Sequence, residues 1–275
     1  MPVTGIDIEK CNGCNICLTT CVVFRPDKEN QKVIFNDPDG FCNACGKCIA
    51  RCPQDAILHD IDDDSYEFEG VNHPETIISY DEIYKFIRAH RSIRLYKGKQ
   101  VEKEKLHKMF EVMRYAPTGG NLRSERFSII SDPIIIKKLS DAVVDQLNKN
   151  QEMHEQYGKL FERISRIFKS PIFFDAPHVV FVESDENSEF EANNIGIIIS
   201  YGRLAAQSLG VGTCWNGWTQ IAMRDNMEIK KIANLTGKRV GVFMLGYPAG
   251  KFFRSPPRSK KAIKGLDLLD LKRKK

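Results

Sequence analysis

Residues 11–21 read CNGCNICLTTC, and residues 42–53 read CNACGKCIARCP. Each stretch contains four cysteines at the spacing Cys-x2-Cys-x2-Cys-x3-Cys, and the second copy starts 31 residues after the first. The two copies together hold eight of the nine cysteines in the chain. Three thiolates of a tight loop and a fourth from a distant point can converge on one metal centre, which can replace the apolar core that a short segment lacks. The repeat therefore predicts a small N-terminal domain that is held together by metal.

The repeat resembles that of bacterial-type ferredoxins, which carry two [4Fe–4S] clusters. In these proteins the fourth cysteine of each run binds the cluster of the other run. The resemblance implies two ligand sets: Cys11, Cys14, Cys17 and Cys52 for the first cluster, and Cys42, Cys45, Cys48 and Cys21 for the second.

Other uses of the cysteines fit the sequence less well. A disulfide framework is typical of short secreted chains, whereas this chain has 275 residues and no recognisable signal peptide. Structural zinc prefers paired Cys-x2-Cys knuckles to four cysteines within eleven residues. Because free thiolates and oxygen-sensitive clusters need a reducing compartment, we expect a cytoplasmic protein.

The composition is that of an ordinary globular protein, with 42% hydrophobic and 28% charged residues. No apolar run approaches the roughly 18 residues of a membrane span, and we expect neither a membrane nor a nucleic-acid partner. Residues 1–76 contain 14 acidic and 6 basic residues, whereas the rest contains 22 acidic and 35 basic residues. This split either favours docking of the N-terminal part onto the C-terminal part or a second copy, or simply reflects an acidic ferredoxin beside a phosphate-binding domain.

The hydrophobic pattern changes near residue 77. Residues 1–62 hold the cysteine repeat, and the acidic, aperiodic residues 63–76 are typical of a linker. In residues 77–275 helices and strands are expected without strict alternation, so we predict an α+β fold. Helices are expected at 80–90, 103–115, 132–147, 151–168, 190–209 and 227–235; strands at 6–8, 32–35, 56–58, 127–130, 179–183 and 239–245; and a basic tail at 272–275.

Three short stretches of the larger part carry chemistry. His90-Arg91-Ser92-Ile93-Arg94 offers two guanidiniums and a hydroxyl group, which can hold a dianionic phosphate. Pro117-Thr118-Gly119-Gly120-Asn121 is a tight turn that leaves Asn121 to present an amide. Cys214-Trp215-Asn216-Gly217 follows the long helix at 190–209 and is coupled to Leu245-Gly246-Tyr247-Pro248. In this order and spacing the stretches resemble the flavin-dependent nitroreductase family, although His90 replaces the usual first arginine.

The resemblance implies a nitroreductase-like α+β domain that binds FMN at the interface of a homodimer, with the turn reaching the flavin from the partner subunit. The implied FMN contacts are His90, Arg91, Ser92 and Arg94 at the phosphate with Arg258 or Arg254, Pro117, Thr118, Gly119 and Asn121 at the ring, and Cys214, Trp215, Asn216 and Gly217 near N5. No side chain stands out as a catalytic acid or base. A single cysteine in an apolar turn is more often a packing residue, so we expect no redox role for Cys214.

A ferredoxin-like module joined to an FMN domain predicts an electron relay, because clusters carry single electrons and flavin stores two. We expect an FMN-dependent oxidoreductase that passes electrons from two [4Fe–4S] clusters to a small electron-poor acceptor, such as a nitro compound or a quinone. No nicotinamide-binding motif is evident, so an external low-potential donor is the expected electron source. Two alternatives stay open: a specialised branch such as reductive dehalogenation, and an electron-transfer adaptor for a partner protein.

Overall fold

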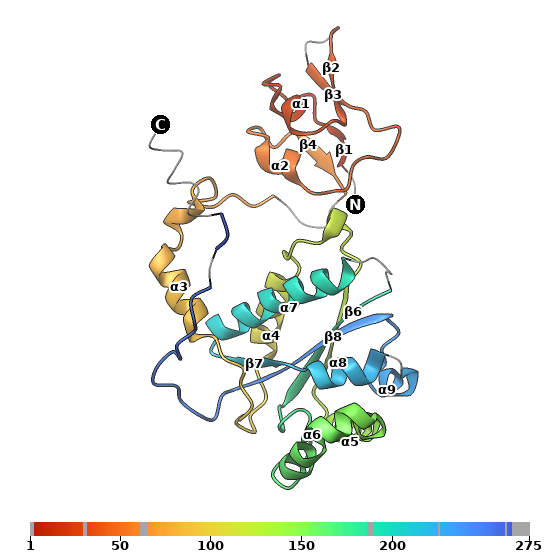
Figure 1. The fold of residues 1–275 in the computed structure, drawn as a ribbon. Coiled ribbons are helices and arrows are strands. Elements are labelled where there is room, and N and C mark those ends of the chain that lie inside the picture. Colours follow the sequence, from red (N-terminus) through yellow and green to blue (C-terminus); the bar gives the residue numbers. More distant parts are fainter. Residues whose placement is uncertain are drawn as a thin grey trace.

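The structure, a computed structural model, describes residues 3–29, 32–60, 65–185, 190–224, 226–261 and 263–265. Figure 1 shows a small part that contains the cysteine runs and a larger part that is built around a sheet. Residues 63 and 64 of the predicted linker and the predicted basic tail at 272–275 lie outside the described residues. In the described part of the chain, no helix is both long and apolar enough to cross a membrane.

The small part consists of two antiparallel strand pairs and two short helices. Its elements are β1 (Val3–Ile6) paired with β4 (Ile57–His59), β2 (Phe24–Asp27) paired with β3 (Lys32–Phe35), α1 (Ile16–Thr20) and α2 (Lys47–Arg51). The predicted strand at 32–35 is confirmed, whereas those at 6–8 and 56–58 are displaced along the chain and β2 was not predicted. Helices of five residues are too short to be stable by themselves, so contacts around the cysteine loops must hold them.

The larger part contains a four-stranded antiparallel sheet in the order β5-β6-β8-β7. These strands are β5 (Arg126–Ile130), β6 (His178–Ser184), β8 (Arg239–Gly246) and β7 (Gly212–Trp215). Every residue of β6 is buried, which shows that both faces of the sheet are covered. An antiparallel sheet between helices confirms the predicted α+β class.

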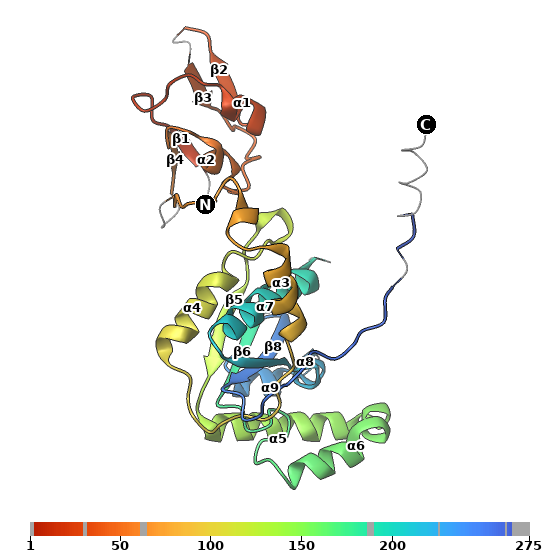
Figure 2. The ribbon, with the colours of Figure 1, turned by 90° about the vertical axis from the view of Figure 1, so that its left-hand side faces the viewer.

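Alternate residues of the central strands point to two separate cores. Val180 and Val182 of β6 face α4 (Lys103–Met113) and α7 (Glu191–Ser208), whereas Val179 and Phe181 face the opposite layer. That opposite layer consists of α5 (Pro133–Lys149), α6 (Gln151–Ser165), α8 (Gly217–Arg224) and α9 (Met227–Ile232). Figures 1 and 2 place α5 and α6 at the end of the molecule farthest from the small part.

The central helix α7 packs closely against its neighbours at two glycines, one in β8 and one in α7 itself. A Cβ atom on Gly241 of β8 would lie 2.6 Å from Ile199 Cδ1, and one on Gly202 of α7 would lie 2.6 Å from Met113 Sδ. The prediction of a long helix covered on several sides is confirmed on these faces, although Ile197 and Tyr201 are exposed. The tight packing holds α7 against β8 and against α4.

α3 (Tyr80–Ala89) lies beside the body of the larger part (Figure 1). It begins with a capping box, in which Ser79 and Glu82 bind each other's backbone N–H groups. None of its residues is buried, and Ile83 and Ile87 of its apolar stripe are 38% and 47% exposed. Local sequence signals therefore specify this helix, but its apolar face packs against nothing large in the described chain. Two 3-10 turns complete the elements, η1 (Pro74–Thr76) and η2 (Gly119–Asn121).

Candidate functional site

The structure brings the two cysteine runs together by exchange of their fourth members. Cys11, Cys14 and Cys17 of the first run line one small pocket with Cys52 of the second run. On the other side, the thiol of Cys48 interacts electrostatically with Cys21 and Cys42. The remaining cysteine of the second run, Cys45, is exposed in the same loop.

The chemistry of these two sets fits a thiophilic metal centre. Burial raises the pKa of Cys17 and of Cys48, so each thiol keeps its proton until a cation compensates the thiolate. The backbone N–H of Ala56 donates to Cys52 Sγ at 3.3 Å, a contact that stabilises negative charge on sulfur. Among the residues that the structure describes, no three His, Cys, Asp or Glu side chains are arranged to hold a single metal ion.

The residues after α3 form an edge with β7 and the C-terminal half of α7. Ser92 forms an isolated parallel β-bridge with Thr213, and the N–H of Ile93 donates to Thr213 O at 2.9 Å. From α7, Arg203 Nε donates to Thr213 Oγ1 at 3.2 Å. Burial lowers the pKa of Arg203, and the neighbouring Arg94 lowers it further.

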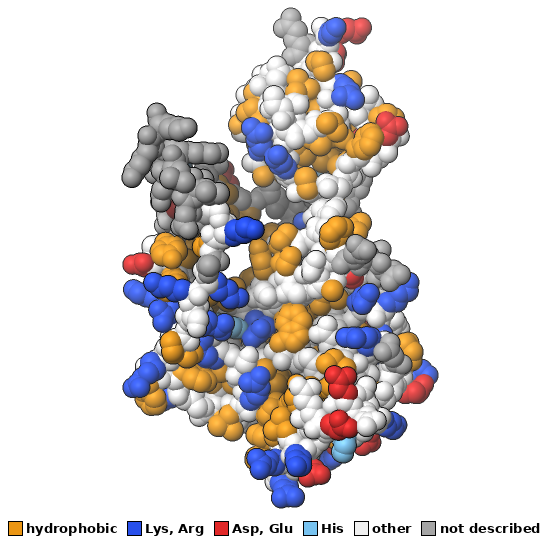
Figure 3. All heavy atoms as spheres, in the orientation of Figure 1, with side chains coloured by type: hydrophobic (Ala, Val, Ile, Leu, Met, Phe, Trp, Pro, Cys, Tyr) orange, Lys and Arg blue, Asp and Glu red, His pale blue; other side chains and the backbone are white. Residues whose placement is uncertain are grey.

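This edge is a candidate anion site. Within the described ranges no carboxylate forms an ion pair with Arg91, Arg94 or Arg203. Arg203 and Arg91 are half-buried and Arg94 is exposed. Burying a cation without a counter-ion costs free energy, so Arg203 and Arg91 favour a bound anion, and Arg94 adds positive charge beside them. Figure 3 shows that Lys and Arg side chains gather on this side of the molecule, over α3 and the residues near it. Arg203 was missed at the sequence level because it lies in an apolar helix that offers no motif.

His90, which was expected at the phosphate, is held by α7. Its Nδ1 lies 2.6 Å from Gln207 Oε1, and Gln207 Nε2 donates to Phe86 O at 2.7 Å. Because the Gln207 oxygen is an acceptor, Nδ1 of His90 carries the proton. Burial lowers the pKa of His90, so the ring is neutral near pH 7 and adds no charge to the guanidiniums.

The C-terminal segment reaches this edge through Ser255. Arg91 Nη2 donates to Ser255 Oγ at 2.9 Å, and Ser255 Oγ donates to Arg88 O at 3.0 Å. Arg254 is therefore next to an anchored residue, whereas Arg258 lies three positions beyond it. Both are exposed, and which of them closes on an anion stays a prediction.

The stretch at 214–217 is used mainly by the fold itself. Cys214 is 1% exposed and its thiol donates to Trp215 O at 3.4 Å, as a packing residue would. The amide of Asn216 donates to Ile172 O at 2.7 Å and accepts from the N–H of Thr219. Gly217 opens α8 with free space beside it. Only the backbone and the half-buried ring of Trp215 are left to meet a ligand there.

The turn that contains Pro117 and Thr118 lies at the opposite end of α7. The N–H of Gly119 donates to Asn194 Oδ1 at 2.9 Å, near the start of this helix. Thirteen residues separate Asn194 from Gln207, which corresponds to about 20 Å along the helix axis. Within one chain, the turn and the guanidiniums therefore lie at two ends of one rigid element (Figure 1).

Asn121 contacts the small part rather than open solvent. Its Nδ2 donates to Asn43 O and to Ala44 O, each at 2.9 Å. Both acceptors belong to the loop between Cys42 and Cys45. Both amide hydrogens of Asn121 already have acceptors in this chain. The expected contact of the Asn121 amide with a flavin ring stays a prediction.

Two carboxyl groups lie behind the turn and were not predicted: Glu191 is fully buried and Glu125 is half-buried. Both oxygens of Glu191 and Oε1 of Glu125 are buried without a hydrogen-bond partner in the described structure. Burial raises the pKa of Glu125, and the proximity of Glu191 adds to the rise, whereas a hydrogen bond with Asn194 opposes it. Burial of an acidic residue depends on tertiary packing, so no sequence signal could have revealed the pair.

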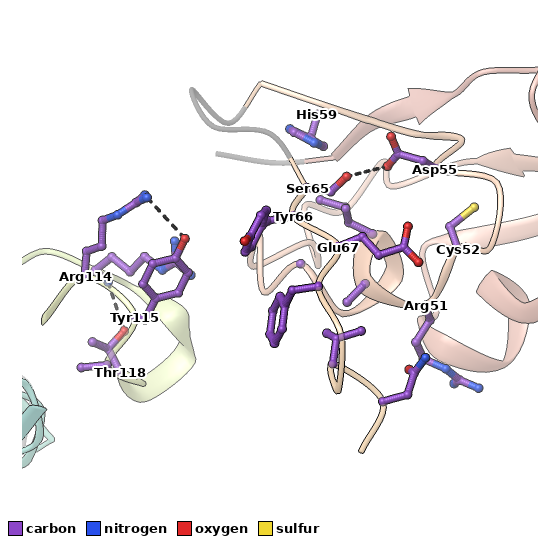
Figure 4. Close-up of a pocket in the computed structure, with 18 of the residues that line it drawn as sticks. Arg51, Cys52, Asp55, His59, Ser65, Tyr66, Glu67, Arg114, Tyr115 and Thr118 are labelled. Atoms are coloured by element: carbon purple, nitrogen blue, oxygen red, sulfur yellow. Dashed lines mark hydrogen bonds between the residues drawn. The ribbon is translucent and has the colours of Figure 1, made fainter. Parts of the chain in front are cut away.

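A cavity of about 1190 Å³ separates the small part from the larger one. Figure 4 shows Arg51 and Cys52 on one wall, with Arg114 and Tyr115 facing them from the other. Tyr66 of the predicted linker lines the cavity between the walls and stacks on Phe68, with ring centroids 5.4 Å apart. The cavity is large enough for a small molecule or a short chain segment.

Comparisons with known proteins agree with this geometry. A protein of Archaeoglobus fulgidus with the provisional name NADH dehydrogenase/NAD(P)H nitroreductase is 26% identical over 176 residues, 61% of this chain and 86% of that protein. The solved structure of a nitroreductase with bound FMN from Bacteroides fragilis is similar with a TM-score of 0.53 and 22% identity, over 67% of this chain and 96% of that chain. An uncharacterized ferredoxin of Methanocaldococcus jannaschii is 39% identical over 57 residues, 19% of this chain and 71% of that protein. A model of the nitroreductase family matches residues 87–247, so the chain belongs to the nitroreductase family of flavin oxidoreductases.

Proposed function

We propose that this protein is an FMN-dependent oxidoreductase that draws electrons from two [4Fe–4S] clusters in its N-terminal part and reduces a small electron-poor acceptor. The observation that carries the proposal is the exchange of Cys52 into the pocket of the first cysteine run. Such an exchange is typical of two-cluster ferredoxins, and it occurs here in a chain with the fold of a nitroreductase. Clusters would supply one-electron transfer, and FMN would supply storage of two electrons.

The unpaired guanidiniums support the assignment of FMN. Arg91 and Arg203 would bind the phosphate with forked, charged donors, and the Ser92 hydroxyl would add a short hydrogen bond. Arg94 lies near Arg203 and would keep the local potential positive, which favours negative charge on the flavin. Neutral His90 would position this edge through Gln207 without competing for the anion.

We also propose that the protein is a homodimer. The turn and the guanidiniums lie at opposite ends of α7, so two chains are needed if both are to meet on one flavin. The exposed apolar faces of α3 and α7 support this arrangement, because stable dimers bury such surfaces. They include Ile83, Ile87, Ile197 and Tyr201.

The immediate test is a count of cofactors in protein that is purified without oxygen. The proposal expects about eight irons, eight sulfides and one FMN per chain. Absence of iron would contradict the electron relay but not a flavoprotein. Absence of FMN would contradict the proposal that the protein is a flavin-dependent enzyme.

A single-turnover experiment separates an enzyme from an adaptor. Reduced protein that is mixed with a small nitro compound or a quinone should reoxidise without any other protein. If the reoxidation stays slow until a partner protein is added, the chain is an adaptor that converts one-electron into two-electron transfer.

The electron donor can be tested with the same material. The A. fulgidus relative is named for NAD(P)H, whereas we propose an external low-potential donor for this chain. Rapid bleaching of the flavin by NADH or NADPH in protein without clusters would contradict an external donor.

A further inference from the structure

The contact between Asn121 and the second cysteine loop uses both the donor and the acceptor atoms of the side-chain amide. Asn121 uses both hydrogens of its amide on two successive carbonyl groups, those of Asn43 and Ala44. Its Oδ1 accepts from Arg123 Nε at 3.0 Å, which fixes the orientation of the amide. The first cysteine loop makes no hydrogen bond to the turn in the described structure, so the two loops are not equivalent.

The backbone on both sides of this contact adopts a conformation that L-residues seldom use. Asn121 has φ 56° and Arg123 has φ 50°, while Ala44 has φ 54°. Asparagine tolerates this region, but alanine and arginine do so at a cost of about 1–2 kcal/mol. Strain of this kind persists where the surrounding structure imposes it, and it is concentrated at functional sites. The Ala44 conformation turns two carbonyl groups toward the turn.

The loop that Asn121 holds belongs to one of the two ligand sets only. It contains Cys42 and Cys45, which belong with Cys48 and Cys21 rather than with the pocket that contains Cys52. A cluster on this set would therefore be the one anchored to the turn. The other would be joined to the flavin domain only through this cluster or across the interdomain cavity.

The position of this contact along α7 decides which flavin is served. Gly119 binds Asn194 at the N-terminal end of α7, whereas Arg203 and Gln207 lie toward its C-terminal end. Along the helix axis, Asn194 is therefore about 14 Å from Arg203 and about 20 Å from Gln207, which binds His90 beside Arg91. In a symmetric dimer, the turn of one chain can instead approach the guanidiniums of the other.

We propose that electrons leave the N-terminal part through the cluster on Cys42, Cys45, Cys48 and Cys21, and that they enter the flavin held by the partner chain. The proposal rests on the proposed function. Each transfer oxidises the cluster by one electron and reduces the flavin by one, so two transfers and protons from solvent complete the reduction. The external low-potential donor then restores the clusters. Asn121 acts as a positioning residue, because it holds the loop and does not itself react.

Mixed dimers test the direction of transfer. One chain carries Cys45→Ala, which removes the anchored cluster, and the other carries Arg91→Ala with Arg203→Ala, which removes FMN binding. In the mixed dimer, the one bound FMN has an intact anchored cluster, on Cys42, Cys45, Cys48 and Cys21, only across the interface. Two different affinity tags allow this dimer to be isolated, and iron and FMN counts verify its composition.

The measurement is the rate of flavin bleaching by dithionite in stopped flow. Direct reduction by dithionite sets the baseline, which the Cys45→Ala homodimer provides. We expect the mixed dimer to bleach at least about tenfold faster than this baseline. Bleaching at the baseline rate would overturn the proposal, since transfer would then stay within one chain. A wild-type protein without clusters or FMN would instead defeat the proposed function, and the cofactor counts reveal that case separately.

A matched cysteine variant tests which cluster is the exit. Cys14 and Cys45 occupy the same position in the two runs, and both are exposed. The Cys14→Ala homodimer should keep fast bleaching, whereas the Cys45→Ala homodimer should lose it. Equal loss in both variants, or loss in Cys14→Ala alone, would refute the assignment of the exit cluster.

Asn121→Gly tests the contact without relying on turnover. Glycine keeps the positive φ while it removes the amide. We expect faster hydrogen exchange of residues 42–46 with unchanged iron and FMN content, and slower flavin bleaching. Leu122→Ala, at a neighbouring position that is 58% exposed, is the control and should change neither quantity. Unchanged exchange in Asn121→Gly would show that the contact does not hold the loop.

Discussion

Replacing Glu125 by glutamine should stabilise this protein at neutral pH, although a carboxylate is hydrated more strongly than an amide. Oε1 of Glu125 and both oxygens of Glu191 are buried without a donor in the described structure. At least one proton on the pair would relieve this arrangement, because two ionised carboxylates this close to each other repel. A glutamine amide supplies that hydrogen permanently and can donate it to Glu191.

The sign of the pH dependence follows from the pKa of Glu125. Burial and Glu191 raise this pKa above its ordinary value of 4.5. A carboxyl group with a higher pKa in the folded state stabilises the fold while it is protonated, and this stabilisation is lost as the pH rises through the folded-state pKa. Wild type should therefore lose stability as the pH rises above 4.5, whereas Glu125→Gln should not.

The magnitude follows from the cost of unsatisfied buried acceptors. Satisfying one such group is worth about 1–3 kcal/mol, and each kcal/mol shifts the Tm of a domain of this size by about 2–4 °C. Thermal unfolding between about pH 5 and pH 8 should show the two Tm values converging in acid and separating toward neutrality. Glu162→Gln, at an exposed position of α6, is the control and should shift neither curve. If Glu125→Gln is less stable than wild type at neutral pH, then Glu125 is ionised and paired, which contradicts an unsatisfied carboxyl group at this position.

Three further changes probe other parts of the structure. Arg203→Ala should weaken FMN binding by about 10–100-fold, the value of one charged hydrogen bond, in a fluorescence titration of the apoprotein; an unchanged Kd would place the phosphate elsewhere. Gly241→Ala should lower the free energy of unfolding by about 1–3 kcal/mol, because its Cβ would meet α7, whereas Gly250→Ala has open space and should be neutral in the same urea titration. His178 Nε2 accepts from the N–H of Val101 at 3.0 Å, and burial lowers the pKa of His178 below 6.5. Its stabilising contribution is therefore present above pH 6.5 and should be lost as the pH falls through the folded-state value; a His178→Gln variant with the same pH profile would contradict this.

The cysteine sets could be predicted because their spacing is itself the constraint. The duplicated spacing resembles that of two-cluster ferredoxins, and this resemblance implied that Cys52 belongs with Cys11, Cys14 and Cys17; the structure places all four in one pocket. Long periodic helices were also predictable: α5, α6 and α7 were expected within about three residues of their ends. Their apolar spacing is kept in the structure because α7 packs on the sheet and α4, whereas α5 packs on α6, α8 and α9.

Short elements and tertiary burial could not be predicted. β7 and α8 follow each other directly within a stretch that reads as a glycine-rich motif, so neither shows a period of its own. Arg203 and Glu191 appear as ordinary polar positions of a helix, and only the fold shows that one borders an anion site and the other is fully buried. For α3 the periodicity indicated an apolar face but not what covers it.

The central helix α7 connects the N-terminal part of the chain with the proposed dimer. Gly202 and Gly241 let α7 lie close to α4 and β8, so its two ends cannot move independently. One end carries the turn and, through Asn121, the second cysteine loop, while the other carries Arg203 beside Thr213. The turn is therefore about 14 to 20 Å along α7 from the residues that border the anion site of its own chain. If the proposed dimer brings the turn of one chain to the guanidiniums of the other, an electron can pass between subunits without any movement of α7.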